Sequence, residues 1–215
     1  MSDAYKSISA ESTGEFKDRG SKFFGYVFPI TEESQFQQRM TELKSTHFKA
    51  GHHCYGFRLR SGLERSSDDG EPSGSAGKPI FNQLLSAELV DVGCIVVRYW
   101  GGTKLGVSGL INAYKNGAAL AIDAAEIITL YNTSKIEIKF DYVHMGRLMD
   151  ILEQSDGKIV DQVLDLHPRL SLEVKESEAL STVDYIKAKI LGRSIDDIKE
   201  DTEVEGLSFE ILEEI

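Results

Sequence analysis

The chain has 215 residues, 41% of them hydrophobic and 27% charged, which suits one large domain or two small ones, so disorder is not the default expectation. No apolar run reaches the roughly 18 residues needed to span a membrane, and the start lacks the pattern of a secretory signal, so we expect a cytoplasmic protein. The net charge of -11 comes mainly from residues 131–215, with 10 Lys and Arg against 20 Asp and Glu, whereas residues 1–130 have 14 against 15. Any contact with nucleic acid should therefore fall to the first part.

The first part is predicted to open as a sheet followed by a helix. Residues 14–30, GEFKDRGSKFFGYVFPI, contain two strand-like runs separated by polar residues. The next segment places Phe36, Met40 and Leu43 at helical spacing behind Thr31, which is a suitable N-cap. We expect these three apolar side chains to face the sheet.

Two further strands and a helix follow. Residues 92–100, VGCIVVRYW, form a near-continuous apolar run, typical of a strand that is covered on both faces. The other strand-like run is CYGFRL, residues 54–59. Cys54 lies in this run and Cys94 in residues 92–100, so we expect free, buried thiols rather than a disulfide. Residues 105–125 form an apolar helix in which Gly117 and its small neighbours would let the helix lie close against the sheet.

The pattern changes near Leu130, where we place a domain boundary between residues 1–130 and 131–215. The second part shows the order strand, helix, strand, strand, helix, strand, with alternating apolar residues in its strands. This order is that of a ferredoxin-like (βαββαβ) domain. The fold class is therefore predicted to be α+β.

The loop of residues 67–80, SDDGEPSGSAGKPI, has almost nothing to bury. Its glycines permit unusual backbone angles and its prolines stiffen it, so it is either a shaped recognition loop or a solvated connector. If it is a recognition loop, its acids need cationic neighbours, for which the chain order offers Arg58, Arg98 and Lys104. We then expect the loop to fold over the turn at residues 101–102, with Glu71 coupled to Lys104.

The turn of residues 98–110, RYWGGTKLGVSGL, is the second unusual stretch. Backbone N–H groups at a helix start beside Arg98 and Lys104 would suit a phosphate group. The alternative is a tight strand-to-helix turn with Tyr99 and Trp100 in the core. Neither stretch has the spacing of a phosphate-binding P-loop, a nucleophilic serine motif or a known metal loop, so we expect no metal and no cofactor.

These two stretches, together with GSKFFGYVFPI and HHCYGFRL, resemble the signatures of the IMPACT/YigZ family over nearly the whole chain. The resemblance implies a first domain folded like the second domain of ribosomal protein five of the small subunit, that is, a ribosomal-protein-domain-2-like β/α domain. It implies a second domain similar to the C-terminal domain of elongation factor G. Eukaryotic members of the family restrain a stress-activated translation kinase, and bacterial relatives have been proposed to bind nucleic acid.

The resemblance also implies a shared surface. Its residues are Asp68, Asp69, Gly70, Glu71, Pro72, Ser73, Gly74, Ala76 and Gly77 in the loop, and Arg98, Tyr99, Gly101, Gly102, Lys104, Leu105 and Gly106 in the turn. The sequence departs from the family at Ser108, where glycine is expected, and at Asn112, where arginine is expected. The missing arginine removes one phosphate-pairing charge.

Our first hypothesis is a non-enzymatic, translation-associated binding protein that contacts RNA, the ribosome or a translation-associated protein through a groove of the first domain. The alternative is an enzyme acting on a phosphorylated or nucleotide substrate, with Lys104 holding phosphate and an acid of the loop acting as base or metal ligand. The sequence does not indicate an oligomeric state.

Overall fold

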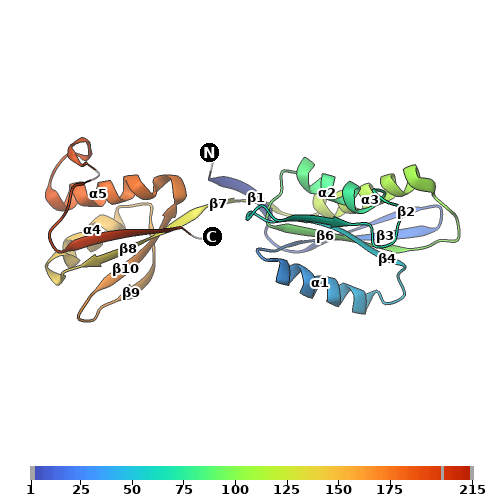
Figure 1. Ribbon diagram of the computed structural model, residues 1–215, viewed down its shortest axis with the longest axis horizontal. Helices are drawn as coiled ribbons and strands as arrows, with labels where there is room; N and C mark the ends of the chain where they lie inside the picture. The colour runs from blue at the N-terminus through green and yellow to red at the C-terminus, as the bar shows by residue number, and fades with distance from the viewer. Residues whose placement is uncertain (1–2, 200, 214–215) are drawn as a thin grey trace. The chain divides into compact units, whose positions relative to one another are not determined.

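The computed structural model describes residues 3–199 and 201–213, which divide into two compact units (Figure 1). The first unit is Tyr5–Leu130, and the second contains the chain from Tyr131 onward together with the first residues. None of the helices in the described ranges combines the length and the apolar surface that crossing a bilayer requires.

The first unit is built around a five-stranded antiparallel sheet in the order β2-β3-β6-β4-β5. A separate two-stranded sheet joins β1 to β7. The elements from Ala4 to Tyr131 are β1 (Ala4–Ile8), β2 (Ser12–Asp18), β3 (Ser21–Pro29), α1 (Glu33–Thr46), β4 (His52–Arg58), β5 (Glu64–Ser67), α2 (Gly77–Ser86), β6 (Val92–Tyr99), α3 (Gly106–Asp123) and β7 (Ile127–Tyr131).

Helices cover both faces of the five-stranded sheet, with α1 on one face and α2 and α3 on the other (Figure 1). The central strand β6 alternates between the two cores. Val96 packs in the core beneath α3, and Val97 packs in the core beneath α1. The prediction that this strand is covered on both faces is confirmed, as are the two free, buried cysteines.

Helix α1 begins one residue later than expected. Its N-cap is Glu32 rather than Thr31, because Glu32 and Gln35 form a reciprocal capping box in which the Gln35 side chain accepts the Glu32 backbone N–H at 3.2 Å. The predicted inward face of Phe36, Met40 and Leu43 is confirmed, since all three side chains are buried.

Helix α3 lies unusually close to the sheet. A Cβ atom added to Gly25 of β3 would overlap the backbone carbonyl of Gly117 in α3. Gly117 itself is buried against Val96 and Phe23. The predicted close packing through small residues is confirmed, and it explains why a helix of the core carries a glycine that lowers its intrinsic stability.

The second unit has the predicted ferredoxin-like order, with helices α4 and α5 on one face of a four-stranded antiparallel sheet (Figure 1). The strand order is β11-β8-β10-β9. Its elements are β8 (Thr133–Phe140), η1 (Tyr142–His144), α4 (Met145–Glu153), β9 (Lys158–Val163), β10 (Arg169–Lys175), η2 (Glu176–Glu178), α5 (Ala179–Leu191), η3 (Ile195–Asp197) and β11 (Leu207–Glu213).

Each unit has its own buried apolar cluster, so we expect fragments 1–130 and 131–215, expressed separately, to unfold cooperatively in urea. Circular dichroism at several wavelengths should give one coincident transition for each fragment. A fragment without a cooperative transition would show that its core depends on the other unit.

Candidate functional site

Several connections of the first unit meet at one end of the five-stranded sheet. Antiparallel pairing places the end of β6 beside the starts of β3 and β4, through the Cα partners Tyr99–Lys22 and Arg98–His52. Helices α2 and α3 also begin there. We call this region the loop end, defined as residues 18–22, 47–52, 67–77 and 98–106.

Asp68 fixes the start of helix α2. Its carboxylate accepts the backbone N–H groups of Gly74 at 2.8 Å, Ala76 at 2.9 Å and Gly77 at 2.8 Å. The first N–H groups of a helix lack partners within the helix, so a carboxylate at this place stabilises it. Burial alone raises the pKa of Asp68, but the three N–H groups together favour the charged form more, and the net pKa is lowered.

We expect Asp68→Asn to destabilise the protein by about 1–2 kcal/mol at neutral pH, because it removes a charged acceptor of three hydrogen bonds. The folded pKa lies below the ordinary value of 3.8, so this stabilisation is complete above that value and is lost as the pH falls through the folded pKa. Urea unfolding of both proteins across acid pH should show the difference between them shrinking. A difference that is constant with pH would exclude the charge as its source.

Asp69 ties the loop to strand β4. Its side chain accepts the backbone N–H of His53 at 2.6 Å, and its carbonyl oxygen accepts a hydrogen bond from Nδ1 of His52 at 2.7 Å. Asp69 has φ 41° and Gly70 has φ 84°, so the chain turns sharply here through left-handed conformations. The second acid of the loop is thus also engaged within the protein.

Glu71 forms a buried ion pair with Arg98. Nη1 of Arg98 lies 2.5 Å from Oε1 of Glu71, and the two side chains are 8% and 4% exposed. The same oxygen accepts the hydroxyl of Tyr114 in α3 at 2.7 Å, and the Arg98 guanidinium lies over the ring of Phe23. Loop, strand β6 and helix α3 are therefore joined at one carboxylate.

Of the expected cationic neighbours, Arg98 is correct and the other two are wrong. Lys104 is exposed and makes no ion pair among the described residues. Arg58 lies at the opposite end of β4, where its Nε is 2.8 Å from Glu64. Chain order places both cations near the loop, but only the strand register decides which end of a strand faces it.

The glycine turn after β6 (residues 101–102) packs against the β2–β3 hairpin turn rather than against the acidic loop. The N–H of Gly101 donates to Oγ of Ser21 at 3.1 Å, and a Cβ on Gly101 would overlap the backbone of Gly20. The expected cover by the acidic loop is thus wrong at this position, because the β2–β3 hairpin turn occupies it. Gly102 and Gly106, with φ 86° and 75°, have open space around them.

The two aromatic residues before this turn differ. Tyr99 is half-buried and its hydroxyl lies 3.0 Å from Nδ1 of His47, whose Nε2 is 2.6 Å from the hydroxyl of Tyr26. Trp100, by contrast, is 65% exposed. The expectation that both rings lie in the core is therefore wrong for Trp100, because the strand ends at Tyr99.

Positive charge remains on the surface of the loop end. Arg19, Lys22 and Lys104 are exposed, and among the described residues none has a carboxylate within the 4.0 Å of an ion pair. Pro72, Ser73 and Gly74 complete the surface of the acidic loop. Two residues of this region were missed from the sequence alone. Arg19 could have been found because Arg19-Gly20 has the pattern of a two-residue hairpin turn, and Tyr114 because a buried tyrosine hydroxyl needs a hydrogen-bond partner.

Cys54 lies beneath the loop. Its Sγ donates to the carbonyl oxygen of Asp68 at 3.0 Å, and burial raises the pKa of the thiol to about 12. A thiol in this state is a poor nucleophile. Within residues 3–199 and 201–213, no three His, Cys, Asp or Glu side chains gather as metal ligands would.

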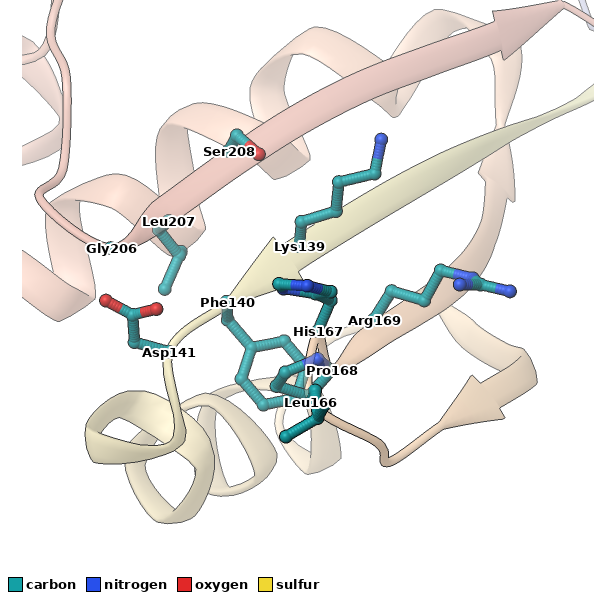
Figure 2. Close-up of a pocket in the computed structure, with 10 residues that line it drawn as sticks. All are labelled: Lys139, Phe140, Asp141, Leu166, His167, Pro168, Arg169, Gly206, Leu207 and Ser208. Atoms are coloured by element: carbon teal, nitrogen blue, oxygen red, sulfur yellow. The ribbon is translucent and has the colours of Figure 1, made fainter.

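A hollow of about 300 Å³ borders the acidic loop, but it opens between α2 and α3 rather than toward the glycine turn. A larger hollow, of about 500 Å³, lies in the second unit (Figure 2). There Lys139 and Arg169 extend from adjacent positions on β8 and β10, and the ammonium of Lys139 lies 2.9 Å from Glu137. Glu137 and Glu210 thus pair with Lys139, whereas Arg169 has no carboxylate within 4.0 Å among the described residues.

Comparison with known proteins gives consistent matches. The model of a family described as "Impact N-terminal domain" matches residues 19–122. "IMPACT family member YvyE" of Bacillus subtilis is 26% identical over 93% of this chain and 92% of its own length. An "IMPACT family member" of Haemophilus influenzae is 30% identical over 75% of this chain and 82% of its own length.

A Thermus thermophilus protein, "IMPACT family member in pol 5'region", is 38% identical over 61% of this chain and 72% of its own length. One solved structure, described as "Crystal structure of an hypothetical protein", aligns with all of this chain and 99% of its own at a TM-score of 0.68 and 22% identity. This last likeness establishes the fold across both units.

Proposed function

The chain belongs to the IMPACT family, and on this premise we propose that it is a non-enzymatic binding protein of the translation apparatus that contacts RNA through the loop end. We place it in the cytoplasm, since its two thiols are free and buried, as suits a reducing compartment. One observation carries the proposal. At the loop end, the carboxylates of the 67–80 loop are bound within the protein, whereas three cations are exposed to solvent.

The three acids of the loop of residues 67–80 are bound within the protein. Asp68 binds the start of α2, Asp69 binds β4, and Glu71 is paired with Arg98. Three cations, Arg19, Lys22 and Lys104, are exposed to solvent and form no ion pair among the described residues. The loop end, although its loop of residues 67–80 is acidic in sequence, thus presents exposed cations that attract phosphates.

The same contacts weigh against the enzymatic alternative. A general base or a metal ligand needs a carboxylate that is free to meet a substrate or an ion. Asp68 and Glu71 already hold hydrogen bonds that stabilise the fold. Using either one in catalysis would break the contact that fixes the loop.

The test is binding of single-stranded RNA and of ribosomes at two salt concentrations. We expect co-sedimentation with ribosomes that RNase abolishes, and RNA affinity that falls steeply with salt. The variant with Arg19, Lys22 and Lys104 all changed to Gln should bind weakly, with a log–log salt slope smaller by about 2, since each lost phosphate contact removes about 0.7.

The matched control changes Lys139 and Arg169 to Gln in the second unit, and we expect its RNA binding to equal that of the unchanged protein. Equal binding by the triple variant would refute the loop end as the RNA site. Ribosome association that persists after RNase and does not respond to salt would instead identify a protein partner.

A further inference from the structure

We propose that Trp100 is a stacking platform for an unpaired base, so that the RNA bound at the loop end is single-stranded there. This inference rests on the proposed RNA contact and names the class of RNA. It begins from the exposure of Trp100, which is 65% accessible and follows a strand in which residues 92–98 are buried. Tryptophan is on average highly buried in folded proteins, and this exposed ring beside exposed cations is available to a ligand.

The backbone on both sides of Trp100 is held in place. Before it, the carbonyl oxygen of Arg98 accepts the N–H of Gly51 at 3.1 Å. After it, Gly101 donates to Ser21 and is packed so closely on Gly20 that no side chain fits. The ring is therefore presented from a fixed segment, and little conformational entropy is lost when a base stacks on it.

Cations lie around this fixed segment. Lys22 is the Cα partner of Tyr99 across β3 and β6, Arg19 precedes the glycine that contacts Gly101, and Lys104 follows in the same turn. A positive surface with an exposed aromatic ring is the arrangement that holds single strands, because phosphates meet the cations while a base meets the ring. In a duplex the bases are already stacked on one another and their faces are hidden.

Phe48 is also exposed at the loop end, but its ring has a neighbour of its own. Nζ of Lys49 lies 5.5 Å from the centre of the Phe48 ring. Trp100 has no ring or cation contact of this kind among the described residues. We therefore assign the stacking position to Trp100.

The chain has one tryptophan, so its fluorescence, excited selectively beyond the absorption of the tyrosines, reports Trp100 alone. The experiment titrates the full-length protein with a short oligouridylate and, separately, with an RNA duplex of equal length. Binding is followed independently by the anisotropy of dye-labelled RNA. We expect the oligouridylate to quench the emission at the concentrations at which anisotropy saturates, and the duplex to leave it unchanged.

Two variants complete the test. Trp100→Ala should weaken oligouridylate binding by about ten-fold, as for one base removed from an aromatic side chain, and Trp100→Phe should keep most of the affinity. Thermal unfolding should be the same for all three proteins because the ring is exposed. Tyr142→Ala, which removes a half-exposed ring of the second unit, is the matched control and should bind normally.

The outcomes separate this inference from the proposed function. Oligouridylate that binds by anisotropy without quenching, and with full affinity for Trp100→Ala, would overturn the stacking platform and leave the RNA contact standing. Equal quenching by the duplex would overturn the single-strand preference. Absence of any RNA binding by anisotropy would overturn the proposed function itself.

Discussion

Replacing Arg98 by methionine is expected to destabilise the protein by about 3–5 kcal/mol, because it leaves the carboxylate of Glu71 buried without its cation. Glu71 is only 4% exposed and would keep the hydroxyl of Tyr114 as its hydrogen-bond donor, with Nε2 of His52 3.8 Å from the same oxygen. Urea unfolding followed by circular dichroism gives the free energy of unfolding directly. The double variant Arg98→Met with Glu71→Gln should recover a large part of the loss, since no charge is then stranded.

The matched control is Arg58→Met in the same unit. Its partner Glu64 is 2.8 Å away, but the two side chains are 31% and 42% exposed, so the loss should stay below about 1 kcal/mol. An Arg98→Met variant as stable as the control would refute the view that this pair anchors the loop. Additive effects in the double variant would mean that the two side chains are not coupled.

Gly25→Ala is expected to be at least as damaging, with a loss of about 3 kcal/mol or more. The added methyl group would meet the backbone carbonyl of Gly117, which cannot move away as a flexible side chain can. Relief would require α3 to shift away from the sheet and to open the core around Phe23 and Val96. Thermal and urea unfolding measure the effect.

Gly51→Ala provides the comparison for this variant. Gly51 has nothing within 4 Å of the position of a Cβ atom and no positive φ, so its substitution should change stability by less than about 0.5 kcal/mol. If Gly25→Ala proves equally harmless, the approach of α3 to β3 is not limited by backbone contact.

The sequence predicts the layers of this fold well because they follow from apolar spacing. Small residues along 105–125 indicated a helix close to the sheet, and the order of elements after Leu130 indicated the ferredoxin-like arrangement. Both inferences require only the positions of the apolar and small residues along the chain. Neither depends on the pairing register of a strand.

The candidate site is predicted less well because its contacts depend on register and on backbone groups. The acids of the loop were expected to meet cations, but Asp68 and Asp69 bind backbone N–H groups, which no residue type reveals. Arg98 is correct because it ends the strand beside the loop, and Arg58 is wrong because it lies at the far end of its own. Trp100 extends an apolar run by one residue, and nothing in the pattern marks where burial stops.

The reactivity of the Cys54 thiol beneath the acidic loop depends on whether the loop is open or closed. Cys54 donates to the carbonyl of Asp68, so a reagent can reach the sulfur only after this part of the loop has lifted. Alkylation of Cys54 is therefore slowed in proportion to the opening equilibrium, and a ligand that holds the loop closed slows it further. The alkylation rate of Cys54 therefore measures how often this part of the loop opens.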